Sequence, residues 1–174
     1  MTNILVVDDD QDFTRSQCDW LKTERYEVLA AFSEQEAKEI LSKKGENICI
    51  ALIDVYMEKK DSGITLVKHI RKLYPYIVPI VITGHAKFED AAACMQEGCF
   101  SYIVKGETPS EKILIIIKSA IEHYRFLTAL PRLRSGLDAA KKQLKEFHKK
   151  MEDLSSTLQR IADEILLHTD NKEG

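Results

Sequence analysis

The chain has 174 residues, which is enough for one well-filled domain of about 100 to 150 residues with an extension and too few for two ordinary domains. Its 25 basic and 28 acidic side chains leave a net charge of −3, so no basic field covers the whole chain and direct nucleic-acid binding is not expected. No apolar run approaches about 18 residues, so no membrane span is expected either. The four scattered cysteines lack metal-ligand spacing and favour reduced, structural thiols in a cytoplasmic protein.

The first half of the chain alternates between strand-like and helix-like segments. Apolar and β-branched residues predict strands over 3–7, 26–31 and 48–54. Helices are expected over 11–23 and from Ser33 to about Lys43. The second of these helices is opened by a Ser33/Glu36 capping box.

The second half continues the same alternation. It predicts a helix over 62–74, a strand over 77–83, a helix over 86–97 that Gly98 ends, a strand over 100–104, and a helix from Pro109 to about Leu127. Five strand–helix units with short connections predict an α/β fold, with a parallel sheet and helices on both of its faces. The spacing alone does not give the strand order.

Polar side chains follow the predicted strands where each strand ends. They are Asp8 and Asp9 after the first strand, Asp54 at the third, Thr83 at the fourth and Lys105 after the fifth. Because the carboxyl ends of parallel strands meet at one edge of a sheet, these side chains are expected to converge. Crowded carboxylates favour a hard divalent cation, for which Mg²⁺ is the natural candidate. The adjacent lysine and hydroxyl favour phosphoryl transfer, with an aspartate attacking phosphorus in line.

Four short motifs in this order and spacing carry a resemblance to a known family: Val-Val-Asp-Asp, Leu-Ile-Asp-Val-Tyr-Met, Val-Ile-Thr-Gly and Tyr-Ile-Val-Lys. Over roughly residues 2–127 the chain resembles the receiver domain of bacterial two-component response regulators. The resemblance implies a flavodoxin-like, doubly wound five-stranded parallel sheet in the order 2-1-3-4-5. It also implies a signalling protein that catalyses only its own phosphorylation and dephosphorylation.

The resemblance also implies a role for each motif residue. Asp54 would accept phosphate from a sensor histidine kinase or phosphotransfer protein, and Mg²⁺ would be held by Asp8, Asp9, Asp54 and the backbone carbonyl of Tyr56. The remaining residues would contact or report the phosphoryl group: Thr83 as the switch hydroxyl, Tyr102 as its aromatic partner, Lys105 as the paired cation, Gly84 as the small residue that leaves room, and His85 at the rim.

Two residues depart from the family pattern, and one neighbour is set aside. Glu58 and Gly106 stand where the family usually has proline. A cis bond costs about 2.5 to 4 kcal/mol when no proline follows it, so the Lys105–Gly106 bond is expected to be trans or strained. Asp10 lies farthest past its strand end and is expected to cap a helix or face solvent rather than to bind metal.

Beyond Pro131 the apolar residues recur with a seven-residue period. One set is Leu137, Leu144, Met151, Leu158 and Ile165; the second is Leu133, Ala140, Phe147, Leu154, Ile161 and His168. This spacing predicts a coiled-coil helix over 132–170 after a receiver domain over 1–128, with an interruption or bend near Pro131. We expect self-association, most simply a dimer, through residues 133–168.

The direction of such a pair stays open. From Arg132 to Lys150 seven basic and two acidic residues sum to +5, and from Met151 to Gly174 two basic and six acidic residues sum to −4. Antiparallel pairing would match these halves and parallel pairing would oppose like charges, although positions e and g carry most of this effect. The resemblance to receiver domains, whose dimers more often lead into parallel linkers, favours the parallel direction instead.

Three functions are compatible with these patterns. The first is a phosphorylation-controlled response regulator whose output passes through the coiled coil or a partner. The second is the regulatory N-terminal part of a longer transcription factor or output enzyme. The third is a dimeric scaffold that is not phosphorylated.

Overall fold

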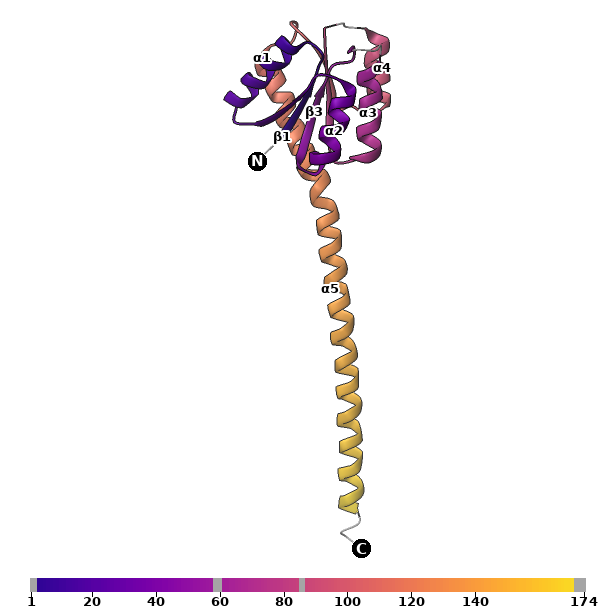
Figure 1. Ribbon diagram of the computed structural model, residues 1–174. Coiled ribbons are helices and arrows are strands. Elements are labelled where there is room, and N and C mark those ends of the chain that lie inside the picture. Colours follow the sequence, from indigo (N-terminus) through magenta and orange to yellow (C-terminus); the bar gives the residue numbers. More distant parts are fainter. Residues whose placement is uncertain (1–2, 58–60, 85–86, 171–174) are drawn as a thin grey trace. The chain divides into compact units, whose positions relative to one another are not determined.

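The computed structural model describes residues 3–57, 61–84 and 87–170, with side chains from 3 to 160 except Arg132. Its centre is a parallel sheet of five strands: β1 (Asn3–Val7), β2 (Glu27–Ala31), β3 (Ile48–Ile53), β4 (Val78–Thr83) and β5 (Ser101–Val104). The strand order is β2-β1-β3-β4-β5, which confirms the predicted doubly wound topology (Figure 1). Every residue of β3 and β4 is buried, because both faces of these central strands are covered.

Helices cover both faces of the sheet. On one face, α1 (Gln11–Thr23) and the first turns of α5 (Ser110–Asp170) pack through Leu21 and Ile117. On the other face, the helices are α2 (Glu34–Lys44), α3 (Ser62–Leu73) and α4 (Phe88–Gln96), as Figure 1 shows. A short 3₁₀ turn, η1 (Gly45–Asn47), joins α2 to β3. Each helix thus buries its apolar side against an apolar strand face, as the periodicity predicted.

Local caps determine where these helices begin. The Ser33 hydroxyl accepts a hydrogen bond from the Glu36 N–H at 3.0 Å, as the capping box predicted. The Glu36 carboxylate accepts from the N–H of Phe32 rather than of Ser33, at 2.8 Å. The Glu36 carboxylate therefore bonds to the residue before the cap, whereas in the usual capping box it bonds to the cap residue itself.

The last helix, α5, runs without interruption from Ser110 to Asp170 and contains Pro131. The predicted interruption at Pro131 is therefore absent, whereas a bend there stays a prediction. Proline removes one backbone hydrogen bond and crowds the preceding turn, but strongly helix-forming sequence on both sides continues the helix. The chain separates into two compact units, Met1–Thr128 and Ala129–Gly174.

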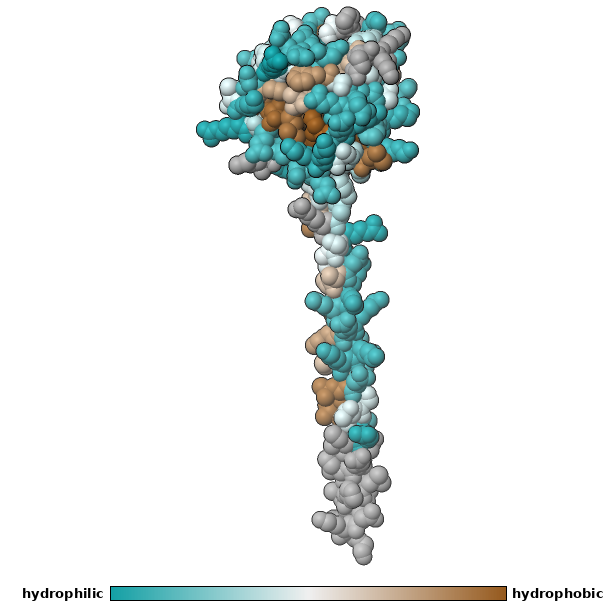
Figure 2. Space-filling view, viewed as in Figure 1, coloured by the Kyte–Doolittle hydropathy of each residue, from teal (hydrophilic) through white to brown (hydrophobic). Residues whose placement is uncertain are grey.

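In the second unit, the apolar seam faces solvent. The side chains of Leu133, Leu137, Leu144, Phe147, Met151, Leu154 and Leu158 are 51–69% exposed. Figure 2 shows apolar residues recurring along one side of this unit among hydrophilic ones. A stripe of this kind is unusual on a helix that has no partner.

All four cysteines are free and buried, in agreement with the prediction of structural thiols. Among the described residues, no helix combines the length and the apolar character that crossing a membrane requires.

Candidate functional site

Three carboxylates meet where β1 and β3 end. The two strands pair in parallel with Val7 opposite Ile53, so Asp8 and Asp54 leave the sheet side by side. The N–H of Asp54 donates to the carbonyl of Val7 at 2.9 Å and extends this pairing by one residue. Carboxylate oxygens of Asp8, Asp9 and Asp54 lie within 4.8 Å of one another. Asp8 and Asp54 are buried and Asp9 is exposed, so the cluster is open to solvent on one side.

Lys105 bridges two of these carboxylates. Its Nζ lies 2.5 Å from Asp8 Oδ2 and 2.9 Å from Asp54 Oδ2, and its side chain is 16% exposed. The residue is held there by β5, because its N–H donates to the carbonyl of Thr83 at 2.8 Å. One cation among three carboxylates leaves excess negative charge, which a divalent ion would neutralise.

The pKa shifts in the cluster follow from burial and pairing. Burial raises the pKa of the Asp8 carboxyl group, although its contact with Lys105 opposes this shift. Burial alone would lower the pKa of the Lys105 ammonium group, but hydrogen bonds to Asp8 and Asp54 outweigh it and the net pKa is raised. Lys105 therefore stays charged at neutral pH and can pair with an anion.

The other predicted site residues lie on the neighbouring strands. Thr83 ends β4 and is completely buried, and Tyr102 is half-buried in β5 opposite Val81. A Cβ added to Gly84 would lie 3.9 Å from Lys105 Cδ, which is ordinary contact. That Gly84 leaves room for a phosphoryl group stays a prediction. His85 and Glu58 lie outside the described residues.

The loop after Asp54 returns to α3 through a close backbone contact. The N–H of Gly63 donates to the carbonyl of Val55 at 3.1 Å. A Cβ at Gly63 would lie 1.9 Å from the carbonyl oxygen of Asp54, so only glycine fits. This role of Gly63 was not predicted from the sequence. The available signal was its position in the first turn of a helix, where glycine is unfavourable unless the backbone requires it.

Tyr56 connects the same loop to the start of α4 through hydrogen bonds. Its hydroxyl donates a short hydrogen bond to Asp90 Oδ2 and accepts one from Lys87 Nζ at 3.1 Å. The Lys87 ammonium also lies 5.0 Å from the centre of the Tyr56 ring. Neither Asp90 nor Lys87 was singled out in the sequence, because each belongs to an ordinary helix start.

Two predictions about neighbouring residues can be checked directly. Asp10 caps α1 by accepting hydrogen bonds from the N–H groups of Asp12 and Phe13, which confirms its capping role. No peptide bond among the described residues is cis, so the Lys105–Gly106 bond is trans, and Gly106 has a φ of 77°. Glycine at this position permits a turn that a proline, with its φ near −65°, would forbid.

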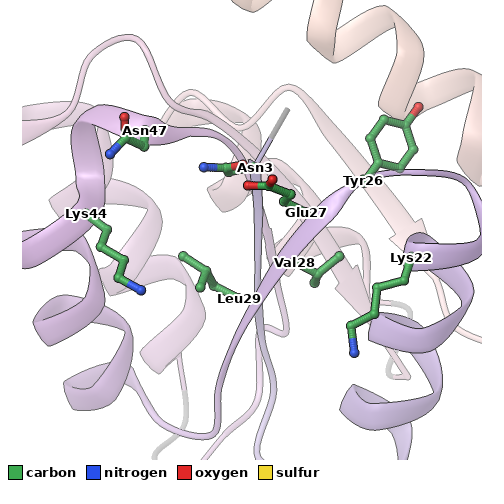
Figure 3. Close-up of a pocket in the computed structure, with 8 residues that line it drawn as sticks. All are labelled: Asn3, Lys22, Tyr26, Glu27, Val28, Leu29, Lys44 and Asn47. Carbon is green, nitrogen blue, oxygen red and sulfur yellow. The ribbon is translucent and has the colours of Figure 1, made fainter. Parts of the chain in front are cut away.

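A separate hollow lies at the opposite end of the sheet, where the strands begin. It has a volume of about 390 Å³ and is lined by Asn3, Lys22, Tyr26, Glu27, Val28, Leu29, Lys44 and Asn47 (Figure 3). It contains none of the predicted site residues. Because parallel sheets place their chemistry at the carboxyl ends of the strands, the carboxylate cluster is the candidate functional site.

Comparison with known families agrees with this geometry. Residues 4–118 match the response regulator receiver domain, and the chain belongs to this family. The hydrogenase transcriptional regulatory protein HoxA of Bradyrhizobium diazoefficiens is 34% identical over 125 residues, which are 70% of this chain and 24% of that protein. The chain spans about a quarter of the length of the curated relatives it matches.

Two solved structures extend the likeness to the backbone. A receiver domain protein from Clostridium thermocellum is 29% identical with a TM-score of 0.68, and the match covers 73% of this chain and 99% of that one. A CheX–CheY–BeF₃–Mg²⁺ complex from Borrelia burgdorferi includes a chain that is 26% identical with a TM-score of 0.62; the match covers 68% of this chain and 87% of that one.

Proposed function

We propose that this protein is a phosphorylation-controlled response regulator in which Asp54 accepts a phosphoryl group from a sensor histidine kinase or phosphotransfer protein. The observation that carries the proposal is the convergence of Asp8, Asp9 and Asp54 with Lys105 at the carboxyl ends of the sheet. In this reaction a carboxylate oxygen of Asp54 attacks phosphorus. The bond from phosphorus to the donor's imidazole nitrogen breaks, and an acyl phosphate forms.

The donor set suits Mg²⁺. All of its side-chain ligands would be oxygens, from Asp8, Asp9 and Asp54, with the Tyr56 backbone carbonyl as a further ligand. When bound, the ion would neutralise charge on the phosphoryl oxygens. Lys105 would leave the Asp54 oxygen that becomes phosphorylated and pair with a phosphoryl oxygen instead. The BeF₃ and Mg²⁺ in the Borrelia burgdorferi complex support this choice of metal and of phosphoryl mimic.

Thr83 and Tyr102 would carry the response outward. Thr83 lies on the strand between those that bear Asp54 and Lys105, so its hydroxyl is within the same edge of the sheet. Tyr102 lies on the neighbouring strand β5 opposite Val81 and is half-buried. Inward rotation of the Thr83 hydroxyl toward the phosphoryl group would free the space into which the Tyr102 ring turns.

A second function has an observation in its favour. Because the chain matches about a quarter of relatives such as a transcriptional regulatory protein, it is also compatible with the regulatory part of a longer regulator. Both functions use the same phosphorylation chemistry. We also propose that the protein is cytoplasmic. Its four buried cysteines form no disulfides, and reduced thiols are typical of that compartment.

Magnesium-dependent binding of a phosphoryl mimic tests the phosphorylation site. Isothermal titration of the full chain with beryllium fluoride is expected to show one saturable site per chain in the presence of Mg²⁺ and no binding after chelation of the metal, because the carboxylates would then repel the anion. The blank is the same titration of beryllium fluoride into Al³⁺-free buffer without protein. Binding of equal strength with and without Mg²⁺ would contradict the proposed ligand set.

The exposed seam points to a second copy of this chain as its partner. The charged residues that flank a seam occupy heptad positions e and g. In a parallel, in-register pair the flanking residues Gln143 and Lys150 would face His148 and Ser155 of the other copy, so no two like-charged residues meet. In the antiparallel register that sets Leu144 opposite Leu154, Lys150 would lie near Lys150 of the other copy, which disfavours that register. We therefore propose a parallel dimer.

Disulfide cross-linking tests both the dimer and its direction. In a parallel pair, Leu144 faces Leu144 of the other copy, so the Leu144→Cys variant is expected to form a covalent dimer under mild oxidation. In the antiparallel register described above, Leu144 would instead face Leu154. Gel electrophoresis without reductant measures the product.

The controls use the same chain. The unmodified protein tests whether its own buried thiols cross-link, and Ser156→Cys places a cysteine on the outer side of the helix. Covalent dimers that form only when Leu144→Cys and Leu154→Cys chains are mixed would show the antiparallel arrangement. No cross-linking of Leu144→Cys, either alone or mixed with Leu154→Cys, would contradict a dimer through the seam.

A further inference from the structure

Phe13 contacts the candidate site although no motif includes it. The Nζ of Lys105 lies 4.3 Å from the centre of the Phe13 ring, which is within the range of about 6 Å for a cation–π contact. Among the described residues, the ammonium group contacts the carboxylates of Asp8 and Asp54 and this ring. The phenyl ring is the uncharged one.

The position of this ring is fixed by the start of α1. Asp10 accepts hydrogen bonds from the N–H groups of Asp12 and Phe13 at 3.1 and 3.0 Å. The Thr14 hydroxyl donates to the carbonyl of Asp8 at 3.2 Å in a buried contact. The turn that carries Phe13 is therefore tied to the strand end that carries Asp8.

Phosphorylation obliges Lys105 to exchange its charged partners. Under the proposed function, on which this inference rests, Asp8 would face a cation and one oxygen of Asp54 would carry the phosphoryl group. Both ion pairs of the ammonium group would then change, whereas its contact with the Phe13 ring would not. A lysine stem is flexible, and without the ring the ammonium group is free to turn toward solvent.

We propose that Phe13 is a positioning residue for Lys105: its ring keeps the ammonium group above Asp54 while the carboxylate partners change. Leucine at this position keeps an apolar side chain against the core cluster that Phe13 joins, but it removes the ring face. The Phe13→Leu variant is therefore expected to lose about tenfold in the rate of Mg²⁺-dependent phosphorylation by acetyl phosphate. The Phe13→Tyr variant keeps a ring and is expected to retain the rate.

A second readout needs neither metal nor phosphate. Because the Phe13 ring lies 4.3 Å from Lys105 Nζ, its ring current is expected to shift the proton resonances of the lysine Cε methylene upfield in the metal-free full chain. NMR spectra should show this shift in the unmodified protein and in Phe13→Tyr, and its loss in Phe13→Leu. Thermal unfolding of each variant shows whether a slower reaction results from lower stability or from displacement of the Lys105 ammonium group.

The outcomes are distinct. If the unmodified chain takes up no phosphate, the proposed function fails. If it does, and a folded Phe13→Leu variant reacts at the same rate, Phe13 only packs against the core and the positioning role is overturned. An unshifted lysine resonance in the unmodified protein overturns the contact itself. Phe13→Met replaces Phe13→Leu if the leucine variant does not fold.

Discussion

Asparagine in place of Asp54 is expected to abolish phosphorylation of the chain. The amide keeps the size of the side chain but lacks the anionic oxygen that attacks phosphorus, so the rate should fall by on the order of 10³-fold or more. The fold should remain intact, because Lys105 keeps its ion pair with Asp8. Intact mass after incubation with acetyl phosphate and Mg²⁺ measures the uptake of phosphate.

The matched control is the same substitution at Asp10. That carboxylate lies two residues from Asp8 in sequence but caps α1, and asparagine is an equally good cap. Asp10→Asn is therefore expected to be phosphorylated like the unmodified protein. Phosphate uptake by Asp54→Asn at the normal rate would remove Asp54 from its proposed role.

Alanine in place of Gly63 is expected to destabilise the receiver unit strongly. The added Cβ would lie 1.9 Å from the carbonyl oxygen of Asp54 and 2.7 Å from the Cα of Val55, and backbone atoms cannot yield as a flexible side chain can. We expect a loss of about 3 kcal/mol or more in the free energy of unfolding, at the upper end of what overpacking costs. Urea unfolding monitored by circular dichroism measures it.

Gly136 offers the control for that substitution. A Cβ there meets nothing within 4 Å, and the residue lies inside α5. Gly136→Ala is therefore expected to be neutral or to stabilise the helix by up to about 1 kcal/mol. Equal stability of Gly63→Ala and the unmodified chain would mean that α3 does not approach the Asp54 loop as described.

The fold could be predicted well because its signals are local. Apolar runs bounded by glycine, proline and polar residues mark strands that are buried on both faces, and β3 and β4 are buried throughout. The strand order came only from the family resemblance, since spacing along a chain does not record which strands pair. The expected interruption at Pro131 rested on the local penalty of about 3 kcal/mol for proline in a helix, but α5 has no break there.

The candidate site could be predicted in part for a similar reason. Asp8, Asp54 and Lys105 each follow a strand end, so a parallel sheet is enough to bring them together. The contacts that were missed join distant segments with no motif of their own. Tyr56 bonds to Asp90, 34 residues away, and the place of Phe13 beneath Lys105 depends on how α1 returns to the sheet.

The central claim is that Asp54 is the phosphoacceptor, and direct mapping of the modified residue tests it. The full chain is incubated with acetyl phosphate and Mg²⁺, the acyl phosphate is reduced with borohydride, and the modified peptide is sequenced by mass spectrometry. We predict a single reduced aspartate at Asp54. A modified residue elsewhere, or no modified aspartate at all, would contradict the claim.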